Sequence, residues 1–359
     1  MKLIFVTKKV CKGDGQARVN YELARFALEH GRQVVVIAQE IDESLIDKGA
    51  VFEQIRPMRF PDILLDISFV ILASLRLFRY RNSYIIGNGF SLIFPHSLNL
   101  VHFVHSGWQK SVYYQPHLTL NPRTWYYFFY TLSNSILEKI SFSLAKEIVA
   151  VSTMIEKELI SFCDIPARTI RTIYNGVDPN EFSPVKKLHK KIIGIFVGDI
   201  RTNRKNLDSV LLAMREIPKL NLWVIGDDRG SAFPKLTKEY ELDGRVTFLG
   251  YRRDIHKILP RGDIFVFPSR YDPCPLVIME ALASGLAVIT SKQTGNWKIA
   301  STAGKTIDNP ENIVKLRKVI SELVDSPEII IKYKNEARKI ALEHSWSKVC
   351  QKYFEVIDS

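Results

Sequence analysis

The stretch at 267–291, FPSRYDPCPLVIMEALASGLAVITS, constrains the fold of this chain more than any other. Its pattern predicts a short apolar strand over 264–267, a proline-rich turn, a helix over 276–284 and a second apolar strand over 286–290. A strand, a helix and a second strand in that order are typical of a parallel α/β sheet, whose ligands bind outside the carboxyl ends of the strands. The stretch therefore predicts a doubly wound sheet that binds a ligand at the carboxyl ends of these strands.

Two carboxylates, Asp272 and Glu280, bracket the start of the predicted helix. The N–H groups of Leu276 and Val277 lie in its first turn, where a helix offers them no internal acceptor, so they suit an anion. Glu280 lies four residues after Leu276 and projects from the same face, where its two oxygens can accept hydrogen bonds from the vicinal hydroxyls of a ribose. From spacing alone, a buried β-α-β unit with a capping Asp and a solvated Glu is the alternative.

The same stretch resembles the E-x7-E signature of the retaining glycosyltransferases of family 4, which have the GT-B fold. Asp272 stands where that family usually has its first Glu, and Glu280 matches as it stands. The resemblance implies two doubly wound, Rossmann-like domains that face a central cleft. It also implies that Asp272 contacts the donor sugar and that Glu280 contacts the ribose of the donor nucleotide.

The length of 359 residues suffices for two domains, each with its own core. Two sets of alternating strands and helices are separated by a charged segment, VKKLHKK, which argues for two doubly wound sheets. We predict an N-terminal acceptor-binding domain at 1–185 and a nucleotide-sugar-binding domain at 186–342. A closing helix at 343–359 resembles the one that crosses back to the first domain in GT-B proteins.

The chain carries 50 Lys and Arg against 38 Asp and Glu, a formal net charge of +12, which favours phosphates or an anionic membrane as partners. Nucleic acid is not expected, because the basic residues are dispersed and no helix-turn-helix, zinc or RNP pattern occurs. The four cysteines are far apart, which indicates a reducing compartment. Without a secretory leader or an apolar run of about 18 residues, we expect a cytoplasmic protein, with peripheral attachment to the inner face of a membrane as an option.

A glycine-containing loop, KKVCKGDGQAR, follows the predicted first strand at 2–7. Gly13 and Gly15 allow a close approach of the backbone to a ligand. The dinucleotide fingerprint is incomplete, because Arg18 occupies its last position, and a plain connecting loop is the alternative. The family resemblance implies that this loop faces the acceptor and the donor phosphates, so that Gly15 is a donor-binding candidate and Gly13 and Arg18 are acceptor-binding candidates.

The segment LVHFVH at 100–105 alternates like a strand and ends at His105. A lone histidine is more often structural than catalytic, but the resemblance implies a histidine beside the donor sugar at the end of this strand. We therefore predict His105 as a catalytic residue. His102, inside the predicted strand, is interpreted as packing.

The loop after the first strand of the second half carries Arg204 and Lys205. Two cations beside a helix N-terminus can neutralise a leaving diphosphate without a metal. A solvated basic loop is the alternative. The family usually has Gly-Arg and then Lys-Gly in this region. Here Gly198 and Lys205 match, Asp199 and Asn206 depart, and Arg204 resembles the first residue of an Arg-Lys pair found in some members.

Two apolar segments of the first half have more than one interpretation. The segment ILLDISFVILASLRLFRY at 63–80 suits a helix buried on one side, and its basic end would suit a membrane surface, although packing in the core is favoured. The run WYYFFY at 125–130 lies within a helical stretch at 123–146 and surrounds it with aromatic rings, so some must be exposed or contact another surface. Lipid headgroups, a dimer contact and a neighbouring helix remain open.

These features predict a hexosyltransferase-type enzyme (EC 2.4) that moves a sugar, with retention, from a UDP- or GDP-sugar to a hydroxyl of a glycan, glycolipid or lipid-linked acceptor in cell-envelope polysaccharide assembly. The predicted catalytic residues are His105, Lys205 and Asp272. The sequence has no D-x-D triplet, so no metal is required, and no cofactor is expected beside the nucleotide-sugar substrate. A GT-B epimerase or phosphorylase, and a non-catalytic module that binds anionic glycan or membrane, are the alternatives.

Overall fold

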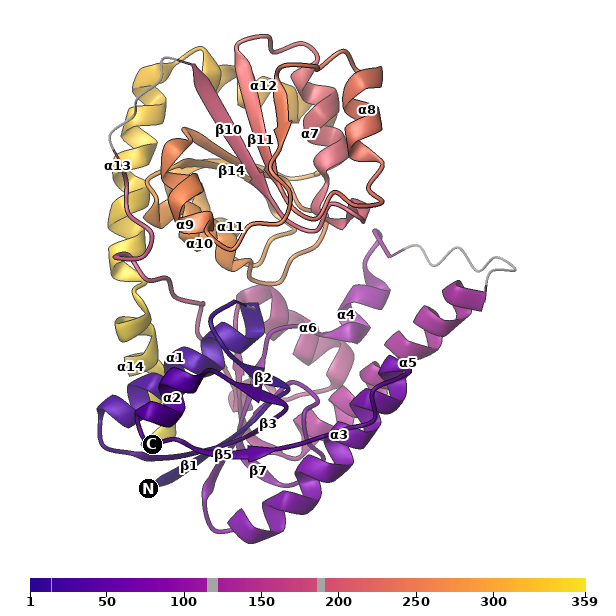
Figure 1. The fold of residues 1–359 in the computed structure, drawn as a ribbon, viewed down its shortest axis with the longest axis vertical. Coiled ribbons are helices and arrows are strands. Elements are labelled where there is room, and N and C mark those ends of the chain that lie inside the picture. The colour runs from indigo at the N-terminus through magenta and orange to yellow at the C-terminus, as the bar shows by residue number, and fades with distance from the viewer. Residues whose placement is uncertain (14, 115–121, 186–190) are drawn as a thin grey trace. The chain divides into compact units, whose positions relative to one another are not determined.

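A computed structural model describes residues 1–13, 15–114, 122–185 and 191–359 (Figure 1). The chain divides into two compact units, one made of residues 1–174 and 349–359 and the other of residues 175–348. Each unit is built on its own parallel sheet with helices on both faces, which confirms the predicted fold class.

The first unit has a seven-stranded sheet in the order β5-β3-β1-β6-β7-β8-β9, and every neighbouring pair is parallel. The strands are β1 (Lys2–Val6), β3 (Gln33–Ala38), β5 (Val51–Gln54), β6 (Tyr84–Asn88), β7 (His96–Val101), β8 (Ala145–Ala150) and β9 (Ile170–Thr172). The order reverses between β1 and β6, so ligands are expected at the carboxyl ends of these two strands. A separate two-stranded ladder joins β2 (Lys9–Val10) to β4 (Glu40–Ile41).

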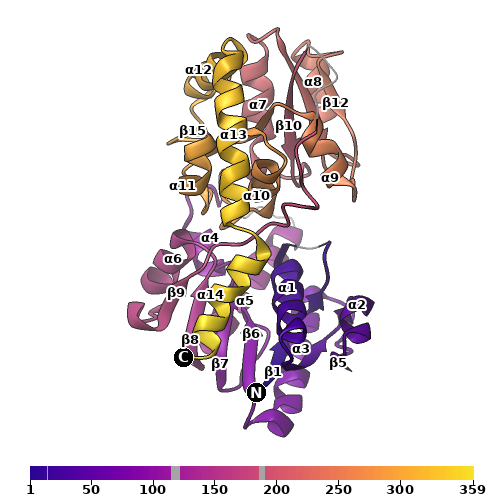
Figure 2. The same cartoon turned by 90° about the vertical axis from the view of Figure 1, so that its left-hand side faces the viewer.

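The longer helices of the first unit bury one side against this sheet. They are α1 (Gly15–Glu29), α3 (Asp62–Leu77), α5 (Pro122–Ser143) and α6 (Thr153–Cys163), and the short α2 (Glu43–Asp47) and α4 (His105–Lys110) complete the set. The end of the last helix, α14 (Trp346–Ile357), packs on α1, with the rings of Phe26 and Phe354 5.0 Å apart (Figure 2).

The second unit has a six-stranded parallel sheet in the order β12-β11-β10-β13-β14-β15. Its strands are β10 (Ile192–Val197), β11 (Leu220–Ile225), β12 (Val246–Phe248), β13 (Ile264–Phe267), β14 (Ala287–Ser291) and β15 (Gly304–Ile307). The order reverses between β10 and β13. The turns that the sequence singled out therefore follow the two strands at the switch point.

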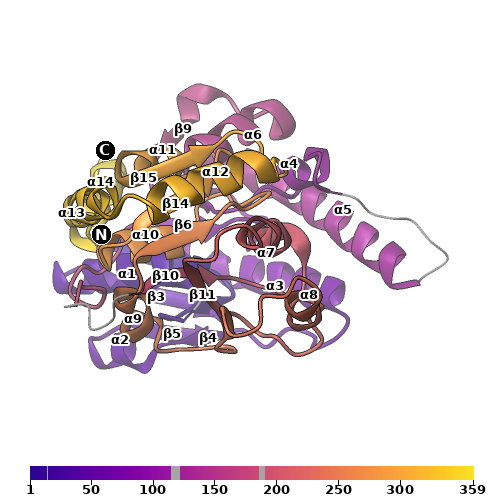
Figure 3. The same ribbon diagram turned by 90° about the horizontal axis from the view of Figure 1, so that it is seen from above.

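Two apolar cores cover the two faces of the second sheet. One contains side chains of α7 (Leu207–Met214), α8 (Phe233–Glu239) and α12 (Ile313–Val324). Figure 3 shows the ribbons of these three helices from above. The other contains side chains of α9 (Ile255–Ile258), α10 (Leu276–Ala283) and α13 (Pro327–Glu343). The short α11 (Trp297–Ala300) lies between β14 and β15.

The boundary between the units falls at Tyr174, before the charged segment where the sequence analysis places it. Residues after Tyr174 belong to the second unit because they bond to it. The Val177 N–H donates to the carbonyl of His344 at 3.0 Å. Phe182 is part of the core that contains side chains of α9, α10 and α13. Most of the charged segment, 186–190, lies outside the described residues.

Candidate active site

The basic loop and the acidic turn of the second unit meet at the carboxyl ends of β10 and β13. Lys205 ends a short 3-10 turn after β10, and Asp272 lies in the turn after β13. Because these strands are parallel neighbours, both turns lie at the same edge of the sheet. The Lys205 ammonium forms an ion pair with the Asp272 carboxylate, and the two side chains are only 12% and 11% exposed.

Burial dominates the electrostatics of Lys205. Desolvation lowers the pKa of its ammonium, and the Asp272 carboxylate acts in the opposite direction. The neighbouring Arg204 guanidinium lowers that pKa further. The Lys205 Nζ also lies 5.2 Å from the centre of the Phe267 ring. A buried ammonium beside a second cation is stabilised by any additional anion that reaches it.

Gly198 and Asn206 allow the backbone conformation and the packing of the basic loop. A Cβ added at Gly198 would lie 3.0 Å from Cγ of Lys205, so glycine leaves room for the lysine stem. Asn206 has a φ of 66°, a left-handed conformation that glycine favours and asparagine tolerates. Its side-chain N–H group also donates to the carbonyls of Pro268 and Pro310, both at 2.9 Å. Asn206 thus adopts a conformation that the glycine of the family pattern adopts easily.

The other departure from the family pattern, Asp199, lies at the surface of the second unit. Its carboxylate accepts hydrogen bonds from the backbone N–H of Arg201 at 3.0 Å and from Nε of Arg201 at 3.2 Å. Arg204 lies half-buried beside Lys205 and donates to the carbonyl of Tyr271 at 3.1 Å. Arg204 therefore provides the second positive charge next to the acidic turn.

Helix α10 presents its first turn and Glu280 on one face. Leu276, Val277 and Glu280 are its half-buried residues, whereas the other five are buried. The N-cap residue, Pro275, makes no side-chain cap hydrogen bond, which leaves the helix start without the usual internal acceptor. Asn296 fixes this start by donating to the Pro275 carbonyl at 3.0 Å.

Arg270, which was not predicted from the sequence, contacts the backbone of the basic loop. Its guanidinium donates to both carboxylate oxygens of Asp208, at 2.9 and 2.6 Å, and also bonds to Glu311 and to the Asn203 carbonyl. Its backbone N–H donates to the carbonyl of Arg204 at 2.9 Å. Burial lowers the pKa of Arg270, but the hydrogen bonds to its two carboxylates outweigh burial and raise it.

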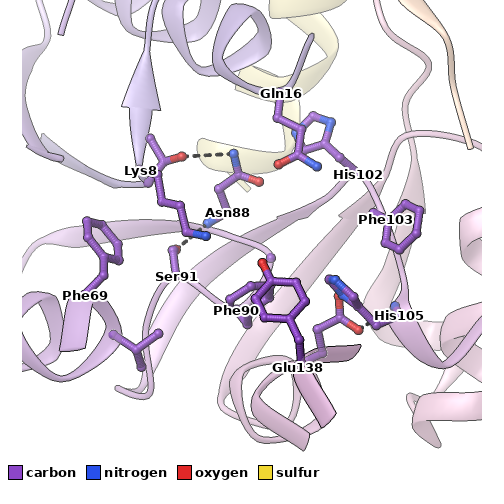
Figure 4. A pocket seen from close by; sticks show the side chains of 14 residues that line it. Lys8, Gln16, Phe69, Asn88, Phe90, Ser91, His102, Phe103, His105 and Glu138 are labelled. Carbon is purple, nitrogen blue, oxygen red and sulfur yellow. Dashed lines mark hydrogen bonds and ion pairs between the residues drawn. The ribbon is translucent and has the colours of Figure 1, made fainter. Parts of the chain in front are cut away.

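The first unit contains a cavity of about 250 Å³ at the carboxyl ends of β1, β6 and β7 (Figure 4). His105 lies in its wall, at the start of α4 and not at the end of the strand, because β7 ends at Val101. The backbone N–H of His105 donates to Oε2 of Glu138 at 2.7 Å, and its Nδ1 lies 2.6 Å from Oε1. Glu138 therefore fixes the orientation of the imidazole ring.

Glu138 is buried, and it was not predicted from the sequence. Desolvation raises the pKa of its carboxyl group, while the hydrogen bond from His105 lowers it. The rings of Phe90 and Phe103 lie 5.6 and 5.0 Å from the imidazole and hold it from the sides. When Glu138 is ionised it favours the proton on Nδ1, which leaves Nε2 directed away from the carboxylate.

A second ion pair lies in the same cavity. Lys8 pairs with Asp66 of α3, and the Tyr130 hydroxyl donates to the second Asp66 oxygen at 3.0 Å. Burial raises the pKa of Tyr130, which keeps its hydroxyl protonated. Asp66 is only 2% exposed.

His102 is buried, as the packing interpretation expects, but it does not lie inside the strand. It follows the end of β7, lies in the cavity wall near Gln16 in Figure 4, and its Nε2 has no hydrogen-bond partner among the described residues. Burial lowers the pKa of His102 to about 4, so the ring is neutral at pH 7.

One residue at the end of the glycine loop reaches the cavity. Gln16 lines it, whereas Gly13, Gly15 and Arg18 are not among its described lining residues. Arg18 is buried on α1, where its Nε donates to Glu22 at 2.7 Å. This hydrogen bond joins Arg18 to a residue of the same helix. The predicted role of Arg18 at the acceptor has no support from this contact.

In the part of the chain that the structure describes, no three His, Cys, Asp or Glu side chains cluster as a metal ion would need.

Two family models match the chain. The model for Glycosyltransferase Family 4 matches residues 13–181, and the model for Glycosyl transferases group 1 matches residues 178–340. Together they take in most of the sequence. The chain belongs to glycosyltransferase family 4. This membership confirms the family that the acidic turn resembles.

Curated relatives match over part of their length. An uncharacterized glycosyltransferase of Methanocaldococcus jannaschii is 27% identical over 246 residues, which are 61% of this chain and 62% of that protein. The Escherichia coli UDP-Gal:alpha-D-GlcNAc-diphosphoundecaprenol alpha-1,3-galactosyltransferase is 33% identical over 147 residues, which are 35% of this chain and 38% of that protein. The matches thus span less than two thirds of these relatives.

Solved structures match the family 4 chain over nearly its whole length. WaaG, a glycosyltransferase of lipopolysaccharide biosynthesis, has a TM-score of 0.80 at 15% identity and covers 99% of both chains. Anabaena HepE, solved with UDP-glucose, has a TM-score of 0.74 at 15% identity and covers 100% of this chain and 99% of its own. At these identities the likeness concerns the fold, which is GT-B.

Proposed function

We propose that this chain is a glycosyltransferase that moves a sugar from a nucleoside diphosphate sugar, with UDP or GDP as the nucleotide, to a hydroxyl of a glycan, glycolipid or lipid-linked acceptor in envelope polysaccharide assembly. The observation that carries the proposal is the buried pair of Lys205 and Asp272, beside Arg204 and the open start of α10. Family membership, a relative named for a UDP-galactose donor and a diphosphoundecaprenol acceptor, and a fold neighbour solved with UDP-glucose support it.

The charges of the second unit suit the leaving group of this reaction. Breaking the bond between the anomeric carbon and the diphosphate oxygen places negative charge on that oxygen. Lys205, Arg204 and the N–H groups at the start of α10 would stabilise the charge, because they are fixed in place before the reaction begins. These cations of the chain replace a divalent metal in the proposed mechanism.

The acidic residues would hold the two sugar rings of the donor. Asp272 pairs with Lys205 and, when the diphosphate binds, shares that cation with it while accepting hydrogen bonds from hydroxyls of the transferred sugar. Glu280, on the α10 face that also carries Leu276 and Val277, would accept hydrogen bonds from the ribose hydroxyls. His105, oriented by Glu138, would contact the transferred sugar from the first unit.

We infer retention of the anomeric configuration. The acceptor oxygen bonds to the anomeric carbon on the face that the diphosphate leaves, and the departing phosphate oxygen takes the acceptor proton. The sequence offers no second carboxylate pair of the kind that forms a covalent intermediate in retaining glycosidases, which favours this front-face route. We place the reaction in the cytoplasm, at the inner face of a membrane.

Calorimetric titration with a panel of nucleoside diphosphates and their sugars tests the proposal. We expect one nucleotide to bind the wild type, and Lys205→Ala to weaken its affinity by about tenfold to a hundredfold, because a charged hydrogen bond is lost. Lys219→Ala is the matched control, since Lys219 is 70% exposed and pairs with Asp325 in the same unit. A wild type that binds no member of the panel, or products released from the donor without any acceptor, would contradict it.

A further inference from the structure

Helix α5 of the first unit exposes a row of apolar side chains. The row, here called the α5 row, consists of Trp125, Phe129, Leu132, Ile136 and Ile140. Their spacing places them on one face of the helix, and each residue is between 40% and 54% exposed. A packed helix normally directs such residues toward the core, so an exposed row on this scale indicates a surface that contacts something else.

Helix α3 exposes a second row beside it. The α3 row consists of Leu64, Ile71 and Leu75 of α3 and of Phe78, the residue that directly follows it, and their exposed fractions range from 39% to 64%. The opposite side of α3 is buried, as the sequence predicts, and α3 packs on α5, where the Tyr130 hydroxyl reaches Asp66. Figure 1 shows the two helices running side by side. The α3 and α5 rows thus lie on the outer sides of one helix pair.

Basic residues flank these rows. Residues 51–146 contain nine Lys and Arg against four Asp and Glu. Two of the acids, Asp66 and Glu138, are buried, and a third, Glu53, lies 3.4 Å from Arg76. Exposed arginines stand close in sequence to the ends of the α3 row: Arg56, Arg59, Arg76, Arg79 and Arg81. The surface therefore combines apolar and aromatic side chains with a positive rim.

We propose that the α3 and α5 rows dock on the surface of an anionic lipid bilayer. Exposed apolar and aromatic residues beside arginines are the features of helices that lie in a membrane interface. Among the described helices, none is long and apolar enough to cross a membrane. A second copy of the chain is the less suitable occupant, because a two-fold contact would bring two copies of the same positive rim together.

The docking surface rests on the proposed function in one respect: docking would bring a lipid-linked acceptor to the first unit. The docking itself depends on no catalytic residue. It can therefore be measured without turnover.

Vesicle flotation of the full chain tests the docking. We expect binding to vesicles of phosphatidylglycerol and phosphatidylcholine, weaker binding at high salt, and little binding to phosphatidylcholine alone. The double variant Phe129→Ser with Ile136→Ser should lower the partition coefficient by about tenfold or more, because two apolar groups no longer enter the interface. Val314→Ser with Ile331→Ser is the matched control, since these residues of the second unit are 66% and 61% exposed. It should bind like the wild type.

Charge reversal gives an independent measurement on the rim. Arg79→Glu with Arg81→Glu should lower the partition coefficient by about tenfold or more at low salt, because each basic residue near an anionic surface contributes about 1 kcal/mol. Both arginines are exposed, so the change leaves the core intact.

Three results would overturn the inference: a wild type that does not float with anionic vesicles, row variants that float as well as the wild type, or a dimer that Phe129→Ser with Ile136→Ser converts to a monomer in light scattering. Nucleotide binding is measured on the same samples. If the wild type binds nucleotide but does not float with the vesicles, only the docking surface is contradicted. If the wild type binds no nucleotide, the proposed function is contradicted.

Discussion

Each unit holds a Lys–Asp ion pair at the carboxyl ends of its parallel strands. The pair of the second unit is mostly buried, whereas in the first unit the Lys8 side chain is 38% exposed, and the surroundings of the two pairs differ. Lys205 and Asp272 lie beside a second cation, Arg204, and the start of a helix. Lys8 and Asp66 lie among aromatic rings, a tyrosine hydroxyl and the buried carboxylate of Glu138.

The charge balance separates the two sites. Among the described residues that line the first cavity, Lys8 alone carries a fixed positive charge, and Asp66 already compensates it. The second site has two cations, Lys205 and Arg204, of which Lys205 pairs with Asp272 and Arg204 donates to a backbone carbonyl. A diphosphate therefore suits the second unit, whereas neutral hydroxyl groups suit the aromatic and polar walls of the first.

The largest effect on activity is expected from replacing Lys205, and Lys8 provides the comparison. Lys205→Ala should lower kcat by about a hundredfold to a thousandfold, because it removes a preorganised charge at the developing phosphate oxyanion. Lys8→Ala should leave nucleotide affinity unchanged, since Lys8 lies in the first cavity. Steady-state kinetics and calorimetry measure both. Equal loss of nucleotide affinity in the two variants would abolish the distinction between the sites.

The next effect tests the support of the basic loop. Arg270→Met should lower kcat by up to about a hundredfold and raise the donor KM less, because the displaced Lys205 acts mainly on the transition state. Arg270→Lys should recover part of the loss. Arg229→Met is the control, since Arg229 makes a similar two-oxygen contact, with Asp227, at the surface of the second unit. If the control variant loses as much activity as Arg270→Met, Arg270 has no positioning role.

A third prediction concerns the first cavity and pH. Burial lowers the pKa of His102 from 6.5 to about 4. Below pH 6.5 the unfolded chain gains a proton at this residue and the folded chain does not, so the free energy of unfolding falls as the pH drops toward 4. Between pH 7 and pH 5 this residue should account for about 2 kcal/mol of lost stability.

Urea unfolding of His102→Asn at both pH values measures that contribution. The variant should lose about 2 kcal/mol less than the wild type on acidification. His256→Asn, in the second unit, should follow the wild type. Identical losses in the wild type and His102→Asn would show that His102 is not buried as a neutral ring.

The smallest effect concerns the orientation of His105. Glu138→Gln keeps the size of the side chain but weakens its hydrogen bond to the imidazole, so kcat should fall by about tenfold. Nucleotide affinity should stay the same, because Glu138 lies in the first unit. A loss of nucleotide affinity equal to the loss of kcat would count against this role.

The sequence predicted those parts of the site that follow from strand order and helix period. Neighbouring parallel strands bring Lys205 to Asp272, and the helical period places Glu280 on the same face as Leu276. The fold class followed from the same patterns.

Contacts between distant side chains could not be predicted in this way. Arg270 to Asp208, His105 to Glu138 and Tyr130 to Asp66 join residues whose spacing has no local period. The error at His102 has a different cause, because alternation extended the strand past its true end at Val101. Arg18 also contacts Glu22 on its own helix, a contact that the predicted acceptor role did not include.

A crystal structure of the chain soaked with the nucleoside diphosphate that binds most tightly tests the central claim most directly. We predict a diphosphate within about 3 Å of Nζ of Lys205 and of the N–H groups that begin α10, with the ribose at Glu280. A diphosphate found in the cavity of the first unit, or on any surface away from Lys205, would contradict it.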